Sequence, residues 1–161
     1  MTGNGHDHQR HMAEAVRISR EMMHDDEGGP FGAVVVKDGE VVGVGHNKVT
    51  STNDPTAHAE VVAIREACRK LGTFDLSGAV IYSSCEPCPM CLSAIYWARL
   101  SAVYYANTRD DAARIGFDDA EIYEEVGKPI DARRLKMTRL PSAEAAAAFD
   151  EWERKEDKVR Y

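Results

Sequence analysis

The chain has 161 residues, of which 43% are hydrophobic and 29% are charged, a composition typical of one globular domain built around a single core. The formal net charge is −7 at pH 7. Because nucleic-acid affinity depends on lysine and arginine neutralising phosphates, this balance argues against RNA or DNA as a partner. No stretch approaches the roughly 20 apolar residues that span a bilayer, and the polar segment Met1 to Met12 does not resemble a signal peptide. We therefore expect a single domain over residues 1–161, with no membrane partner.

The first third of the chain predicts a helix followed by a hairpin. Apolar residues at helical spacing run through His8 to His24. Two strands follow, Phe31 to Lys37 and Glu40 to Gly45, joined by Asp38-Gly39, a pair that readily adopts the positive φ of tight hairpin turns. This hairpin places Asn47 just past the end of its second strand.

The rest of the chain alternates helices and strands after a loop at Thr50 to Pro55. We expect, in chain order, a helix from about Thr56 to Leu71, a strand from Val80 to Ser84, a helix opening at Pro87, a strand from Ala102 to Ala106, an acidic stretch from Asp118 to Glu125, and a helix from roughly Ser142 to Lys155 before a charged tail. This order predicts a three-layer α/β/α fold, with a mixed central sheet of about five strands covered by helices on both faces.

Two short segments, His58-Ala59-Glu60 and Pro87-Cys88-Pro89-Met90-Cys91, carry the chemistry. Two thiolates and an imidazole suit Zn²⁺, and three protein ligands leave the fourth tetrahedral position free for water, which marks a catalytic site. His58 and Glu60 are expected in the first turn of one helix, and Cys88 and Cys91 in the first turn of the next. Free backbone N–H groups there favour thiolate and keep the imidazole neutral. Glu60 is not needed as a ligand and is placed to move protons.

Other arrangements of the cysteines stay open from the sequence. Cys85, Cys88 and Cys91 form a C-x2-C-x2-C run like that of an iron–sulfur loop, but no fourth cysteine follows three residues later. Cys85 could also complete a closed structural zinc site, although such a site gives no reason for Glu60. Thiols that bind zinc must stay reduced, which points to the cytoplasm.

At these residues the chain resembles the cytidine-deaminase superfamily, and within it the small bacterial guanine deaminases. The segments shared with the superfamily are Thr56-Ala57-His58-Ala59-Glu60 and Pro87-Cys88-Pro89-Met90-Cys91, which carry the H-x-E and P-C-x-x-C signature of zinc-dependent nucleobase deaminases. The narrower likeness rests on Gly29-Pro30-Phe31-Gly32-Ala33, Cys85-Glu86-Pro87-Cys88, Ile95-Tyr96-Trp97-Ala98-Arg99, Gly116-Phe117-Asp118-Asp119 and the terminal Tyr161. The resemblance covers nearly the whole chain after about Gly28.

The resemblance implies zinc-dependent hydrolysis of guanine to xanthine and ammonia, with one Zn²⁺ per chain. It implies zinc binding by His58, Cys88 and Cys91, proton transfer by Glu60 and Asp119, and purine binding by Asn47, Phe31, Trp97, Phe117 and Tyr161. Family members form a homodimer that exchanges C-terminal segments, so the tail at about 156–161 would place Tyr161 over the site of a partner chain. Plain interpretations stay open for several of these residues: Asn47 as a turn residue, Phe31 and Phe117 as core aromatics, Asp119 as a solvated carboxylate and the tail as a frayed end.

Other functions remain compatible with the same zinc signature. A tRNA adenosine deaminase shares the segment Asp54 to Glu60, although the acidic balance and Phe117-Asp118-Asp119 speak against it. The substrate could also be another aminated heterocycle or nucleoside, such as guanosine, ammeline, cytosine or cytidine. A chain that has lost activity would be a zinc-stabilised binding module, which the intact set of zinc ligands and Glu60 argues against.

Overall fold

The computed structural model describes residues 5–161. The first four residues of the polar N-terminal segment, for which a signal peptide was not expected, lie outside the described residues. Contacts between Cα atoms divide the chain into two compact units, Met1–Asp119 and Ala120–Tyr161, and each is described by itself. The first unit holds every strand and the helices that follow the predicted zinc ligands.

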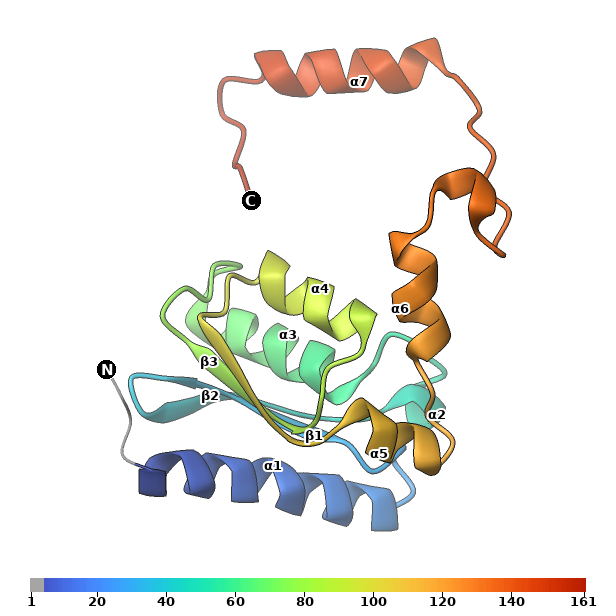
Figure 1. The fold of residues 1–161 in the computed structure, drawn as a ribbon. Helices are drawn as coiled ribbons and strands as arrows, with labels where there is room; N and C mark the ends of the chain where they lie inside the picture. The colour runs from blue at the N-terminus through green and yellow to red at the C-terminus, as the bar shows by residue number, and fades with distance from the viewer. Residues whose placement is uncertain (1–4) are drawn as a thin grey trace. The chain divides into compact units, whose positions relative to one another are not determined.

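The centre of the first unit is a mixed sheet in the order β2-β1-β3-β4 (Figure 1). β1 pairs antiparallel with β2 and β3, and β3 pairs parallel with β4. Asp38 and Gly39 adopt φ angles of 52° and 82° between β1 and β2, which confirms the predicted turn. The strands are β1 (Gly32–Lys37), β2 (Glu40–His46), β3 (Val80–Cys85) and β4 (Ala102–Asn107).

Helices cover both faces of this sheet, which confirms the three predicted layers (Figure 1). On one face, Ile18 of α1 (Gly5–His24) joins Val34, Val36 and Tyr82 in a buried cluster. On the other face, α3 (Ala59–Leu71) and α4 (Pro89–Trp97) pack over a second cluster that includes Ala33, Val35 and Ile81. The alternation along β1 follows from the two-residue period of a strand, because successive side chains point to opposite faces.

Small residues allow α3 to approach β2 closely. Ala59, Ala63 and Ala67 recur every four residues on one side of the helix and are fully buried. A Cβ on Gly45 would lie 2.1 Å from the carbonyl oxygen of Ala59, and one on Gly43 would lie 2.3 Å from that of Ala63. Side chains at these two strand positions would therefore push away the helix, including the N-terminal end that carries the predicted site residues.

The sheet has four strands among the described residues, and the prediction of about five was wrong in this detail. After β4 the chain turns helical because Thr108 begins a capping box: its side chain accepts a hydrogen bond from the N–H of Asp111, whose carboxylate accepts one from the N–H of Thr108. Consequently α5 (Arg109–Arg114) follows β4 directly, and α6 (Ala120–Gly127) occupies the acidic stretch. A one-turn helix, α2 (Val49–Thr52), also lies at the predicted loop.

The second unit contains α6, a short 3₁₀ helix at Ile130–Ala132 and α7 (Ala143–Arg154). Ser142 caps α7 by accepting a hydrogen bond from the N–H of Ala145, so the last predicted helix is confirmed. No residue of these three elements is buried, and the unit therefore has no hydrophobic core of its own. Within residues 5–161, no helix has the length and apolar character needed to cross a membrane.

Gly45→Ala is expected to destabilise the protein strongly, because its Cβ would collide with backbone atoms of α3 that cannot move alone. We expect the free energy of unfolding to fall by about 3 kcal/mol, the upper end of overpacking effects. Urea denaturation followed by circular dichroism measures the change. Gly5→Ala is the matched control, since a Cβ there meets nothing within 4 Å; equal stability of the two variants would contradict the close approach.

Candidate active site

His58 and Cys88 directly precede α3 and α4 and form the N-caps of the two helices. The sequence predicts both residues inside the first turns, so each helix begins later than expected. Asp54 explains the later start of α3, because its carboxylate accepts hydrogen bonds from the N–H and the hydroxyl of Thr56, in a local turn that competes with helix. Pro89 explains the later start of α4, because a residue before proline is driven to extended backbone, and Cys88 has a ψ of 169°.

His58, Cys88 and Cys91 form a compact set of metal-binding atoms. The Sγ atoms of both cysteines lie 3.5 Å from Nδ1 of His58, and the three donor atoms lie within 4.8 Å of one another. A tetrahedral zinc with Zn–S of about 2.3 Å and Zn–N of about 2.0 Å separates sulfur from nitrogen by about 3.5 Å. The set therefore fits one zinc ion, and sulfur with imidazole nitrogen is a donor set that favours zinc over magnesium or calcium.

The two cysteines differ in acidity because one donates a hydrogen bond to the other. The hydrogen bond from Cys91, with help from His58, lowers the pKa of Cys88 to about 4. Because the thiol of Cys91 donates this hydrogen bond to Cys88, and because it is buried, the pKa of Cys91 is raised. The hydrogen bond with Cys88 also raises the pKa of His58, which is opposite to the direction expected from the helix end alone. These contacts therefore favour the thiolate form of Cys88, the form of cysteine that binds a metal.

Glu60 lies in the first turn of α3, where only 7% of its surface is exposed. Burial raises the pKa of its carboxyl group, which also interacts with Cys91. Its Oε1 accepts a hydrogen bond of 3.1 Å from the hydroxyl of Ser83 on β3. A carboxyl group that lies beside the three donor atoms, but outside the metal-binding set, can accept and return protons.

Cys85 lies outside the metal-binding set found among residues 5–161. Its thiol donates instead to the carbonyl oxygen of Thr108, 3.6 Å away, and burial raises the pKa of Cys85 to about 11. Neither the closed zinc site nor the iron–sulfur cluster is therefore supported by this part of the chain.

Asn47 is buried, and its side-chain amide has a defined orientation. Its Oδ1 accepts hydrogen bonds from the N–H groups of Gly29, at 3.4 Å, and Val49, at 3.1 Å. Gly28 passes so close that a Cβ on it would lie 2.5 Å from the same oxygen. Because Oδ1 takes backbone donors, the amide presents its Nδ2 hydrogens as donors on the other side.

The structure brings two of the predicted aromatic residues together near Asn47. Phe31 and Phe117 meet edge to face, with ring centroids 4.9 Å apart. A Cβ on Gly29 would lie 3.1 Å from the Phe31 ring and 3.2 Å from the Phe117 ring, so this glycine contacts both rings and bonds Asn47. The rings and the Asn47 amide therefore form one cluster around Gly29.

The other predicted residues differ in where they lie. Burial raises the pKa of Asp119, and the negative charge of Cys88 adds to the effect, which places this carboxyl group within electrostatic reach of the donor set. Trp97 ends α4 at the end opposite to the cysteines, with 68% of its surface exposed. Tyr161 belongs to the second unit, and its role stays a prediction.

Sequence reasoning missed Ser83, whose hydroxyl reaches Glu60. Ser83 was assigned to a buried strand with no role of its own. The usable signal was its spacing from Ile81: residues two apart in a strand share one face, so the hydroxyl of Ser83 lies on the same buried, apolar face as Ile81. A buried hydroxyl needs a hydrogen-bond partner, so its position in the pattern pointed to a polar group on the covering helices.

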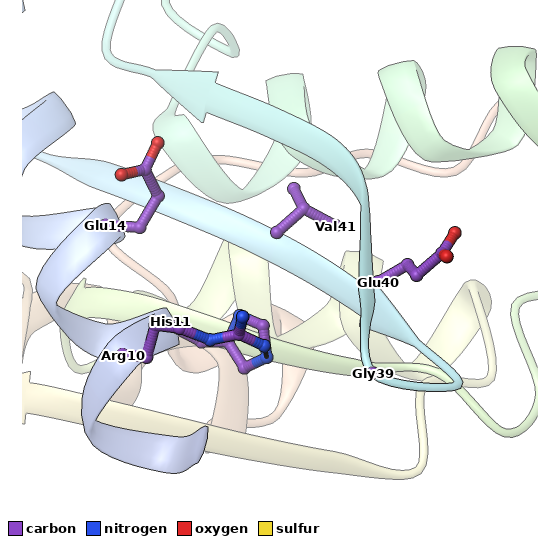
Figure 2. A pocket seen from close by; sticks show the side chains of 6 residues that line it. All are labelled: Arg10, His11, Glu14, Gly39, Glu40 and Val41. Atoms are coloured by element: carbon purple, nitrogen blue, oxygen red, sulfur yellow. Dashed lines mark hydrogen bonds between the residues drawn. The ribbon is translucent and has the colours of Figure 1, made fainter. Parts of the chain in front are cut away.

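A surface cavity of about 430 Å³ lies between α1 and the turn that joins β1 to β2 (Figure 2). It is lined by Arg10, His11, Glu14, Gly39, Glu40 and Val41. These residues flank the α1 face of the sheet, whereas the metal-binding set lies where α3 and α4 begin, on the other face. The cavity is therefore separate from the candidate active site.

Residues 6–107 match the family described as the cytidine and deoxycytidylate deaminase zinc-binding region. This range covers most of the chain and contains all three metal-binding residues together with Glu60 and Asn47. The chain belongs to this deaminase family. Its members are zinc-dependent hydrolases, in agreement with the donor set of His58, Cys88 and Cys91.

Individual relatives within the deaminase family extend the likeness. The guanine deaminase of Bacillus subtilis is 48% identical over 154 residues, which is 96% of this chain and 99% of the relative. Its X-ray structure matches with a TM-score of 0.93 and covers 96% of this chain and 98% of the other. The tRNA-specific adenosine deaminase of Aquifex aeolicus is 35% identical, over 78% of this chain and 81% of its own. A guanine deaminase structure from Nitrosomonas europaea is 34% identical, with a TM-score of 0.65, over 68% of this chain and 63% of the other.

Cys88→Ala should remove zinc from the protein, because two remaining ligands hold the ion poorly. We expect close to one zinc per chain in the wild type and a large loss in the variant, measured by elemental analysis of purified protein. Cys85→Ala is the matched control and should retain its zinc, since Cys85 bonds to Thr108. Zinc loss in both variants would instead indicate a site with three cysteine ligands.

Proposed function

We propose that the protein is a zinc-dependent guanine deaminase that converts guanine and water to xanthine and ammonia. The observation that carries this proposal is the likeness to the Bacillus subtilis guanine deaminase, which extends over 96% of the chain. The tRNA-specific adenosine deaminase of Aquifex aeolicus matches less of it. The net charge of −7 supports a small neutral base as substrate in preference to a polyanionic nucleic acid.

The proposed mechanism divides proton transfer between two carboxyl groups. His58, Cys88 and Cys91 would hold the zinc ion, which would supply the Lewis acidity that makes water a nucleophile at neutral pH. Glu60 takes a proton from the attacking water and delivers it to the ring nitrogen next to C2 of guanine, which frees the carboxylate for the next transfer. Asp119 assists transfer of a proton to the exocyclic amine, because the amine leaves as ammonia only when protonated.

Recognition of the purine is assigned to Asn47 and to the aromatic residues. The Nδ2 hydrogens of Asn47 are fixed as donors by the bonds that hold Oδ1, and guanine offers acceptors at O6 and N7. Phe31 and Phe117 supply an apolar surface beside the amide. Trp97 would complete this pocket only when its exposed ring is covered.

We infer that residues 1–161 act as one domain in a homodimer whose C-terminal tail, about 156–161, covers the site of the partner chain. The second unit supports this proposal because none of its helical residues is buried. Apolar side chains along it, such as Leu135, Leu140 and Phe149, are at least 74% exposed. Such a segment needs an apolar surface to pack on, and a second copy of the chain provides one.

The cellular setting follows from the same chemistry. All four cysteines are free, and zinc-binding thiols persist where the environment is reducing. We therefore propose a cytoplasmic enzyme acting on a small purine, without nucleic-acid or membrane partners.

Glu60→Gln tests the proton-transfer role, because glutamine keeps the shape of the side chain but cannot accept a proton. Turnover of guanine should fall by roughly 10²–10⁴-fold, the range typical of general acid–base groups, while zinc content and guanine binding persist. The assay is ammonia release from guanine.

The substrate of the wild-type protein is tested with the same assay on guanine, guanosine, ammeline, adenine, cytosine, cytidine and a tRNA anticodon hairpin. If the wild type prefers another substrate, that substrate replaces guanine in this proposal. If it releases ammonia from none of them, a binding module is favoured.

Deletion of Val159 to Tyr161 tests the role of the tail. Deamination should fall sharply because the site loses its cover. Zinc content should stay unchanged, because Val159 and Tyr161 are more than 60% exposed and contribute no core packing. A cover over the site excludes bulk water and must also open to admit the base. Full activity of the shortened protein would make the tail a solvated end.

Mixing the tail-deleted chain with the Glu60→Gln chain distinguishes a swapped tail from a tail that folds on its own chain. In the mixed dimer, an intact tail from one chain meets an intact Glu60 in the other, so one working site should be recovered from two inactive parents. Ammonia release is compared before and after mixing, with heterodimer formation verified by native mass spectrometry. Heterodimers that stay inactive would contradict the exchange.

A further inference from the structure

We propose that Ser83 is a positioning residue that holds the Glu60 carboxylate in its proton-transfer orientation. The inference rests on the proposed function, because it concerns the group that moves protons in that reaction. Ser83 lies on β3 and Glu60 in the first turn of α3, 23 residues apart in sequence. The hydroxyl donates a hydrogen bond of 3.1 Å to Oε1 of Glu60.

This hydrogen bond is inaccessible to competing water. Ser83 has 2% of its surface exposed and Glu60 has 7%. A hydrogen bond in such surroundings is stronger than the same bond in solvent. The hydrogen bond therefore favours a single orientation of the carboxylate.

A glutamate side chain needs such a restraint because its last torsion is soft. Backbone packing at Gly45 sets the position of the helix end, but the carboxyl group can still turn about its terminal bond, which has broad rotational preferences. The bond from Ser83 fixes the direction of Oε1, and the direction of the other oxygen, Oε2, is fixed with it. An oxygen displaced by about 1 Å can reduce the rate by roughly 10²-fold, so orientation matters for turnover.

The neighbouring residue, Ser84, provides a contrast within the same strand. Its Oγ accepts a hydrogen bond of 3.0 Å from the N–H of Gly32 at the start of β1, and it is 3% exposed. Successive residues of a strand point to opposite faces. Two adjacent buried serines therefore have different roles, one toward the carboxylate and one toward the backbone of the sheet.

The experiment compares Ser83→Ala with Ser84→Ala. Ser83→Ala should lower kcat for guanine by roughly 10- to 100-fold, with KM, zinc content and calorimetric binding of xanthine unchanged. Ser84→Ala should lower the urea midpoint, since it leaves the buried N–H of Gly32 unsatisfied, with kcat near that of the wild type. A wild-type kcat in Ser83→Ala, or an equal loss of kcat in both variants, would overturn the proposal.

If Ser83→Ala fails to fold, a second pair of variants, with side chains of the same shape as each other, provides the test. Ser83→Thr and Ser83→Val fill the same volume, but only threonine retains the hydroxyl. The proposal requires that threonine keep most of kcat and that valine lose it. Equal kcat values in the two variants would show that the side chain contributes packing only.

A double-mutant cycle with Glu60→Gln shows whether Ser83 acts through Glu60. In the Glu60→Gln background, Ser83→Ala should produce no further loss of kcat, because the proton transfer that it supports is already absent. Losses that multiply would mean that Ser83 acts on another group. If the wild type does not turn over guanine, the proposed function fails, and the same variants are then compared on whichever base releases ammonia.

Discussion

The close packing of α3 against β2 is the constraint on which the site depends. Backbone atoms of Ala59 and Ala63 lie where side chains at Gly45 and Gly43 would be, so the helix axis is drawn toward the sheet. His58 and Glu60 are attached to the N-terminal end of that helix and are carried with it. Only at this depth does Glu60 come within hydrogen-bond reach of Ser83 on the third strand of the sheet order.

Two of the three metal-binding residues, His58 and Cys88, cap helices, and the third, Cys91, lies in the first turn of α4. His58 and Cys88 both have extended backbone, with ψ angles of 153° and 169°. An extended cap residue points its side chain back across the helix end, where unpaired N–H groups concentrate positive potential. Cys88 uses this directly, since its Sγ accepts the N–H of Cys91. This hydrogen bond caps the start of α4 and at the same time stabilises a thiolate at Cys88.

How much could be predicted from the sequence depended on how local each signal was. The spacing of His58, Cys88 and Cys91 predicted the donor set, and the Asp38-Gly39 pair predicted the turn. The exact starts of α3 and α4 were missed because a carboxylate, in Asp54, and a proline, at Pro89, override the apolar periodicity. The bond between Ser83 and Glu60 was missed for a different reason: it joins residues far apart in sequence, and no short pattern reports the depth at which a helix packs on a sheet.

The candidate site residues fall partly inside and partly beyond the region that matches the family. The zinc ligands, Glu60 and Asn47 all fall within residues 6–107, the region shared across the family, and tRNA-specific adenosine deaminases match this chain over part of its length. Phe117, Asp119 and the second unit lie beyond that region. One zinc site can activate water for attack on many bases, whereas the residues that close around a base must match its size and its donors. The proposed preference for guanine therefore depends on Asn47 and Phe31 inside this region together with Phe117 beyond it.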